Sequence, residues 1–107
     1  MRPKPGEVWL ADLGLAAKTR PVVIVSREDP DPPRALVTCI PLTTQYRESE
    51  YEVALSKIRF LKQRSFANTQ GIGSIPIARL ERKIGDLPED TVDEIYDAIF
   101  FALDFEG

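Results

Sequence analysis

The stretch Arg20-Pro21-Val22-Val23-Ile24-Val25-Ser26 contains the strongest strand signal in the chain. Its four central residues are all β-branched and apolar, a run typical of a strand buried on both faces. Pro21 stands at the start of the run, where a missing backbone N–H matters least to a sheet. The stretch therefore predicts a central strand over residues 22–26.

Further strands are predicted on both sides of this one. Large apolar residues over 6–13 predict the first strand, and alternation over 51–55 predicts a half-exposed one. The Pro- and Asp-rich segment 27–34 is expected to be a loop. The remaining predicted elements are strands over 35–43, 65–70 and 73–77, and a short helix over 78–84 that ends at Gly85.

The clearest helix prediction is at the end of the sequence. Pro88 suits a first helical position, and the acidic residues after it complement the helix dipole. One apolar stripe recurs at helical spacing through Val92, Ile95, Tyr96, Ile99, Phe100 and Leu103. We therefore expect a mainly β fold with a C-terminal helix (α+β), a small SH3-like β-barrel, with residues 1–107 forming one domain.

The composition limits the available chemistry. The 107 residues include no histidine and a single cysteine, Cys39. A histidine-based proton shuttle, a conventional structural zinc site and an internal disulfide are thereby excluded, and we expect no metal and no cofactor. The apolar run over residues 99–103 is too short to span a bilayer, and the polar N-terminus does not resemble a signal peptide. We expect a cytoplasmic protein with no membrane association.

The net charge of -3 is distributed very unevenly. Residues 86–107 contain eight acids and no bases, so residues 1–85 contain all fourteen bases and nine acids, a balance of +5. A basic body can attract phosphates while the acidic helix faces away. An acidic face that is merely solvated is an equally good interpretation of the helix. We expect the helix acids, such as Asp93 and Asp97, to point away from any groove in the basic body.

A first candidate cluster precedes the central strand, at Lys18-Thr19-Arg20-Pro21. The proline fixes the backbone direction, and the guanidinium of Arg20 is suited to a phosphate. The alternative is a salt bridge between Arg20 and a nearby acid such as Glu7 or Asp12.

Other candidate residues are polar groups at the ends of predicted strands. Thr43 and Thr44 can donate to phosphate oxygens, and Gln45 can bind a base edge; local turn capping is the alternative. Asn68 and Gln70 could bind bases or satisfy the backbone. The basic–aromatic stretch 57–66 is typical of single-strand binding, although its aromatic residues could be core. Trp9 and Tyr46 are interpreted as packing residues.

In this order, the motifs resemble those of the MazF/PemK family of toxin endoribonucleases from bacterial toxin–antitoxin systems. The matching pieces are Pro5-Gly6-Glu7-Val8-Trp9, Lys18 to Ser26, Pro41-Leu42-Thr43-Thr44-Gln45, Gln70-Gly71, Ala78-Arg79-Leu80 and Ile84-Gly85-Asp86-Leu87. The resemblance covers roughly residues 3 to 103. It implies a homodimer of barrels of the CcdB/MazF type, metal-independent cleavage of single-stranded RNA and inhibition by a cognate antitoxin.

The resemblance also implies roles for individual residues. Arg20 and Thr43 match the catalytic positions, and Lys18, Thr19, Thr44, Gln45, Asn68 and Gln70 are the expected RNA-binding residues. The RNA 2′-hydroxyl supplies the nucleophile, so the expected products are a 2′,3′-cyclic phosphate and a 5′-hydroxyl. Many family members carry an acid at or just before the position of Thr69, and this chain has none there, which leaves the general base unassigned. A CcdB-like gyrase poison and a non-catalytic binding barrel remain alternatives.

Overall fold

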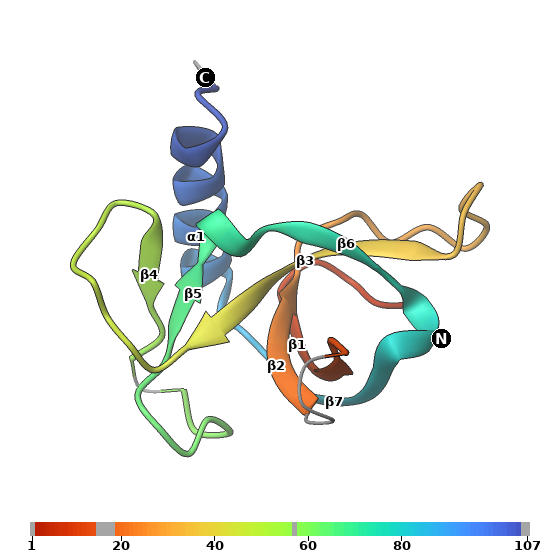
Figure 1. The fold of residues 1–107 in the computed structure, drawn as a ribbon, viewed down its shortest axis with the longest axis horizontal. Helices are drawn as coiled ribbons and strands as arrows, with labels where there is room; N and C mark the ends of the chain where they lie inside the picture. The colour runs from red at the N-terminus through yellow and green to blue at the C-terminus, as the bar shows by residue number, and fades with distance from the viewer. Residues whose placement is uncertain (1, 15–18, 57, 106–107) are drawn as a thin grey trace.

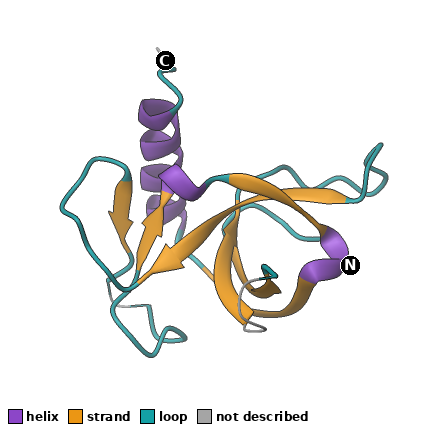
Figure 2. Ribbon diagram, in the orientation of Figure 1, coloured by secondary structure: helices purple, strands orange, loops and turns teal. Residues whose placement is uncertain are grey.

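A computed structural model describes residues 2–14, 19–56 and 58–105 of the chain. Seven strands and one α-helix are found in this part (Figures 1 and 2). The strands are β1 (Glu7–Asp12), β2 (Thr19–Ile24), β3 (Leu36–Thr43), β4 (Glu52–Ala54), β5 (Phe66–Asn68), β6 (Gly73–Pro76) and β7 (Leu80–Asp86). Helix α1 spans Glu89–Ala102, and single 3-10 turns occupy Thr69–Gly71 and Ile77–Arg79.

The strands form one antiparallel sheet in the order β4-β5-β3-β2-β1-β7. The long strand β3 pairs with β6 through its first half and with β5 through its last two residues. The turn Ile77–Arg79 joins β6 to β7. The sheet curls so that β1, β2, β3, β6 and β7 form a small barrel (Figure 1). The prediction of a mainly β fold with a C-terminal helix is confirmed.

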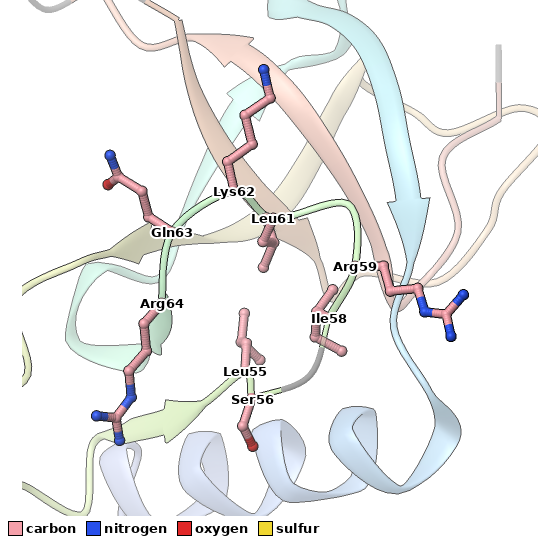
Figure 3. Close-up of a pocket in the computed structure, with 8 residues that line it drawn as sticks. All are labelled: Leu55, Ser56, Ile58, Arg59, Leu61, Lys62, Gln63 and Arg64. Atoms are coloured by element: carbon pink, nitrogen blue, oxygen red, sulfur yellow. The ribbon is translucent and has the colours of Figure 1, made fainter.

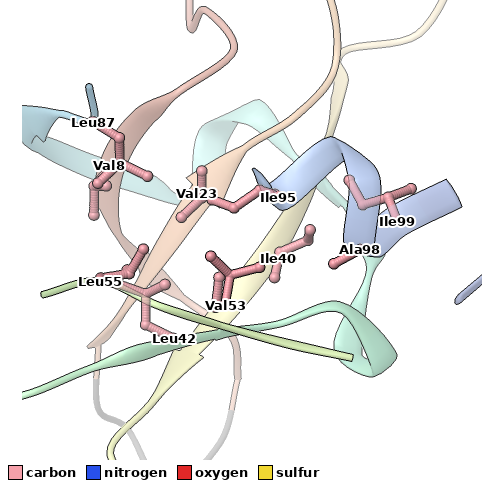
Figure 4. Packing of buried hydrophobic residues seen from close by; sticks show 11 residues of the cluster. Val8, Val23, Ile40, Leu42, Val53, Leu55, Leu87, Ile95, Ala98 and Ile99 are labelled. Carbon is pink, nitrogen blue, oxygen red and sulfur yellow. The ribbon is translucent and has the colours of Figure 1, made fainter. Parts of the chain in front are cut away.

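Strand β2 is buried on both faces, as its β-branched run predicts. Val23 packs into a core between the sheet and α1, which also contains Ile40, Val53, Ile95 and Ile99 (Figure 4). The neighbouring residues Val22 and Ile24 face the opposite way, into a second core inside the barrel with Ala11, Val37, Cys39 and Leu80. The two cores hold β2 and β3 in place from both sides, so the ends of these strands are rigidly positioned.

Helix α1 lies beside β4 and the 3-10 turn after β5 (Figure 1). Its apolar stripe buries Ile95, Ala98 and Ile99. The hydroxyl of Tyr96 donates to the carbonyl of Val25 at 2.8 Å, which ties the helix to the end of β2. No helix in the described residues combines the length and hydrophobicity needed for a membrane span.

The predicted helix over residues 78–84 is wrong. Only Ile77–Arg79 forms a helical turn, and Leu80–Asp86 is strand β7, paired with β1. Pairing to β1 and burial of Leu80 in the barrel core override the local helix propensity of this segment. The predicted strand 65–70 is also shorter than expected, because β5 ends at Asn68 and a 3-10 turn follows.

Candidate active site

The ends of β2 and β3 bring Arg20 and Thr43 together. Val22 pairs with Pro41 and Ile24 with Cys39. Continuing this antiparallel register by two residues on each strand places Arg20 opposite Thr43, a spacing that brings side chains into contact range. Because side chains alternate along a strand, both residues lie on the face of Val22 and Cys39, where the barrel core ends and solvent begins.

Both side chains line a cavity of about 730 Å³. Its polar residues come from four separate segments of the chain: the start of β2, the end of β3 with the two residues after it, the loop before β5, and β7. They are Thr19, Arg20, Thr43, Thr44, Gln45, Lys62, Gln63, Ser65 and Arg82. The cavity has three cationic side chains among its described lining residues and no carboxylate, which is the electrostatic character expected of a phosphate site.

Arg20 is exposed and makes no ion pair within the described residues. Its guanidinium Nη1 donates to the neighbouring Thr19 carbonyl at 3.2 Å, which leaves most of its donors available. The salt bridge with Glu7 considered as an alternative is not formed, because Glu7 binds Lys83 with its Oε2 atom 3.1 Å from Nζ. Asp12 instead accepts the Gly14 N–H. Lys18 lies outside the described residues.

Thr43 is half-buried, and its Oγ1 accepts the backbone N–H of Gln45 at 3.1 Å. The local turn capping considered from the sequence is therefore present. It uses the hydroxyl only as an acceptor, so the hydroxyl proton can still be donated to a phosphate oxygen. Thr44 and Gln45 are exposed beside it and line the same cavity.

A second, smaller cavity of about 240 Å³ adjoins the first and shares Thr43 and Gln45 with it. Its other walls are Arg47, Glu52, Asn68 and Gln70. The Asn68 Oδ1 atom accepts the Gln70 N–H at 3.1 Å, which leaves the side-chain NH₂ of Asn68 as a free donor. The structure thus brings seven of the eight predicted site residues to two neighbouring cavities, the exception being Lys18.

Glu52 is the only carboxylate among the described residues of these two cavities. It lies across from Asn68 in the β4–β5 pair. Desolvation opposes its ionisation, but hydrogen bonds from the Ser49 side chain and backbone and from the Arg47 N–H outweigh this and lower its pKa. A carboxylate with a lowered pKa and occupied oxygens is a weak proton acceptor, so its evident role is to hold the loop after β3.

Thr69 is at, or just after, the position where the resemblance would have suggested an acidic residue. It is fully buried, and its hydroxyl donates to the Tyr51 carbonyl at 2.7 Å. This threonine is therefore a packing residue that anchors the 3-10 turn, and it does not reach either cavity. The single cysteine offers no nucleophile either, since burial raises the pKa of the Cys39 thiol to about 11.

Residues 58–65 of the basic–aromatic stretch lie in the loop between β4 and β5, and Phe66 begins β5. Figure 3 shows Leu55, Ile58 and Leu61 pointing into the interior of this loop, where they line a cavity of about 540 Å³. The charged side chains Arg59, Lys62 and Arg64 radiate outward (Figure 3). Only Lys62 of these three also lines the cavity of Arg20, so the loop adds one cation to that site. Ile58, Phe60 and Leu61 pack against the core, as considered from the sequence.

Arg82 is one of the cavity residues that sequence reasoning missed. It was placed in the predicted helix, whereas in β7 it pairs with Leu10 and lines the cavity together with Ile84. The apolar residues Leu80 and Ile84 are four positions apart, a spacing that suits a helix as well as a strand, so the local pattern held no clear signal for Arg82. Among the described lining residues of the large cavity, none comes from α1, which agrees with the expectation that the helix acids point away.

The arrangement provides anion stabilisation without an internal nucleophile. Two arginines and a lysine surround a polar cavity whose threonine hydroxyl and amide side chains can fix the orientation of a bound ligand. Such a site suits a phosphodiester that carries its own attacking group.

A model of the "PemK-like, MazF-like toxin of type II toxin-antitoxin system" family matches residues 4–103. The chain belongs to the MazF/PemK toxin family. A curated relative, Endoribonuclease MazF3 of Mycobacterium tuberculosis, is 34% identical over 89 residues, which cover 83% of this chain and 86% of the relative.

Solved MazF-family structures share the fold. A mycobacterial endoribonuclease in complex with its cognate antitoxin superposes with a TM-score of 0.85 at 27% identity, covering 98% of both chains. The Mycobacterium tuberculosis toxin MazF-mt6 gives a TM-score of 0.83 at 32% identity, covering 94% of this chain and 99% of that toxin. These MazF relatives favour the endoribonuclease over the gyrase poison and the non-catalytic barrel.

Proposed function

We propose that this MazF-family toxin endoribonuclease cleaves single-stranded RNA in the cavity lined by Arg20, Thr43 and Arg82. The observation that carries the proposal is the placement of an unpaired arginine and a threonine hydroxyl on adjacent strand ends in one cationic cavity. The 2′-hydroxyl attacks the adjacent phosphorus, the bond to the 5′-oxygen breaks, and a 2′,3′-cyclic phosphate and a 5′-hydroxyl result.

Arg20 and Thr43 act on the phosphate in this proposal. The guanidinium of Arg20 stabilises the charge that develops on the non-bridging oxygens, and the Thr43 hydroxyl donates to one of them. Thr19, Thr44, Gln45, Asn68 and Gln70 bind the sugar, backbone and bases on either side, and Lys18, which precedes Thr19 in the sequence, adds positive charge. Solvent accepts the 2′-hydroxyl proton and supplies the proton that the 5′-oxygen takes up. No metal or cofactor takes part.

The partners proposed for this chain follow its family. We expect a homodimer of barrels and inhibition by a cognate antitoxin, as in the antitoxin complex of the mycobacterial relative. Exposed Phe100, Phe101, Leu103 and Phe105 near the end of α1 supply apolar surface of the kind that protein partners cover. A single toxin domain over residues 1–107 and a cytoplasmic location complete the proposal, and the free thiol of Cys39 fits a reducing compartment.

Cleavage of a defined single-stranded RNA pool in EDTA tests the proposal. Arg20→Lys keeps the charge but loses the planar fork, and we expect cleavage to fall about 100-fold or more. Thr43→Val should cause a loss of similar size, whereas Thr43→Ser, which keeps the hydroxyl, should retain most activity. A single 2′-deoxy nucleotide at the cut site should block cleavage. Full activity of Arg20→Lys and Thr43→Val in folded protein would contradict the assignment of both residues.

A further inference from the structure

Tyr46 is an exposed aromatic residue that directly follows Gln45, which lines both cavities of the site. Its side chain remains 46% exposed although one ring face is covered. That face stacks on Phe66 with the ring centroids 4.4 Å apart and the planes inclined by only 5°. Because Phe66 is 2% exposed, the covered face of Tyr46 rests on the core, and the exposure of Tyr46 comes from its other face and its edge.

The loop that presents Tyr46 is held at both ends. The Thr43 hydroxyl accepts the Gln45 N–H before it, and Glu52 accepts the N–H groups of Arg47 and Ser49 after it. The Ser49 hydroxyl also donates to Glu52 at 2.9 Å. A ring fixed in this way loses little conformational freedom when a planar ligand stacks on it.

The position of the ring is tied to the proposed cleavage site. Phe66, which supports it, pairs directly with Thr43 in the β3–β5 register. Tyr46 follows Thr43 by three residues, so their backbones lie at most about 11 Å apart. The ring is therefore within reach of a nucleotide adjacent to a phosphate bound at Thr43.

Two cationic side chains lie near the stacked pair, although the loop also carries Glu48, Glu50 and Glu52. The Arg64 guanidinium carbon lies 5.2 Å from the Phe66 ring centroid. Arg47 extends to the Gln45 amide, with Nη2 3.5 Å from Oε1. An exposed aromatic face next to an arginine and a base-reading amide is a combination that binds single-stranded nucleic acid.

We propose that Tyr46 is a stacking platform for one RNA base next to the cleaved bond, and that Gln45 contacts the edge of that base. The inference rests on the proposed RNA cleavage at Arg20 and Thr43 and adds a specificity-determining residue to it. Tyr46 supplies binding through its ring face, so its hydroxyl is dispensable, and it takes no part in the chemical step.

The test begins with cut sites mapped on the RNA pool. A short RNA that spans one site is made with a 2′-deoxy nucleotide at the cut, so that it binds without being cleaved. The fluorescent base 2-aminopurine is then placed in turn at each position flanking the cut. We expect wild-type protein and Tyr46→Phe to quench it at one position, and Tyr46→Leu to lose that quenching and bind about 5- to 100-fold more weakly.

Two controls separate stacking from packing. Leu36→Ala removes an apolar side chain of nearly equal exposure, 44%, from the start of β3, outside both cavities, and should leave binding unchanged. An abasic nucleotide at the quenched position should weaken the wild-type complex but not that of Tyr46→Leu. If wild-type protein cleaves RNA while Tyr46→Leu binds and quenches equally well, the platform is wrong and the proposed function stands. If wild-type protein cleaves no RNA, the proposed function fails and the platform fails with it.

Discussion

The ring of Phe60 packs against Gly85 so closely that a methyl group at Gly85 would overlap the ring atoms. This contact fastens the loop between β4 and β5 to strand β7. Since Phe60 and its neighbours Leu61 and Lys62 line the cavity of Arg20, the contact also sets one wall of the candidate site.

Gly85→Ala should therefore displace Phe60 and the loop that carries it. Overpacking of this kind typically destabilises by about 1–3 kcal/mol. We expect urea unfolding to show this decrease in the free energy of unfolding, and RNA cleavage assays to show a raised KM for RNA. Phe60→Leu in the Gly85→Ala background makes room for the methyl group and should restore part of the stability. If the two substitutions changed the free energy of unfolding by simply additive amounts, the ring and the glycine would not constrain each other.

The rate of RNA cleavage should increase as the pH is raised. The two cavities contain no histidine, and their one carboxylate, Glu52, has a lowered pKa, so it is ionised throughout the neutral range. With solvent hydroxide removing the 2′-hydroxyl proton before the rate-limiting step, the single-turnover rate should rise about tenfold per pH unit between about pH 6 and 8. A rate that is flat over this range would instead indicate a protein base that is already deprotonated.

Glu7 should make the stability of the fold depend on pH in the acid range. Although burial opposes its ionisation, hydrogen bonds from Trp9 and Lys4 and the nearby Lys83 ammonium lower the pKa of this 7% exposed carboxyl. The stabilisation is therefore complete above the unfolded pKa and is lost as pH falls through the lower folded value.

Glu7→Gln tests this dependence. It should lower the free energy of unfolding at pH 7 by about 1.5–3 kcal/mol, the range for hydrogen bonds to a charged group. The difference from wild type should shrink as pH falls through the unfolded glutamate pKa of about 4.3 and on through the lower folded value, where Glu7 itself becomes protonated. A difference that stays constant down to pH 2 would rule out ionised Glu7 as its source. Asp86, which is exposed and shares Lys83, provides a matched variant, Asp86→Asn, with a smaller expected effect.

Glu52 should affect RNA binding more than the chemical step. Glu52→Ala removes the acceptor for the N–H groups of Arg47 and Ser49 and so loosens the loop that carries Gln45 and Tyr46. We expect a KM about tenfold higher with kcat changed less than threefold. Glu50→Ala, which removes an exposed acid from the same loop, is the charge-matched control. A fall in kcat at unchanged KM would point to a direct chemical role for Glu52.

The elements with a strong local signal were predictable from the sequence. The β-branched run 22–25 gave β2 its two buried faces, and the helical stripe gave α1. Segment 78–84 misled because good helix formers fill it, while pairing with β1 determines its structure. Register shifts in that pair also disturb its alternation.

Part of the site depended on contacts between distant segments and could not be predicted. Position at a strand end makes Thr43 and Gln45 candidates, and the proline after Arg20 makes that arginine one, but only the resemblance to the MazF/PemK family selects them as site residues. Arg82 and Lys62 reach the same cavity only through the β1–β7 pairing and the Phe60–Gly85 contact. Tyr46 was interpreted as a packing residue, and its sequence neighbours do not reveal that one ring face stays exposed.

The candidate catalytic residues and the candidate base-binding residues are held in place by different parts of this small protein. Arg20 and Thr43 are fixed by strands that both cores clamp, whereas Gln45 and Tyr46 lie on a loop held by the Thr43 hydroxyl at one end and by Glu52 at the other. With Gln45 and Tyr46 binding bases as proposed, substitutions at the loop positions would alter which bases are preferred without disturbing the barrel. Such a division would make substrate choice readily evolvable, because the target sequence could change while Arg20 and Thr43 stay the same.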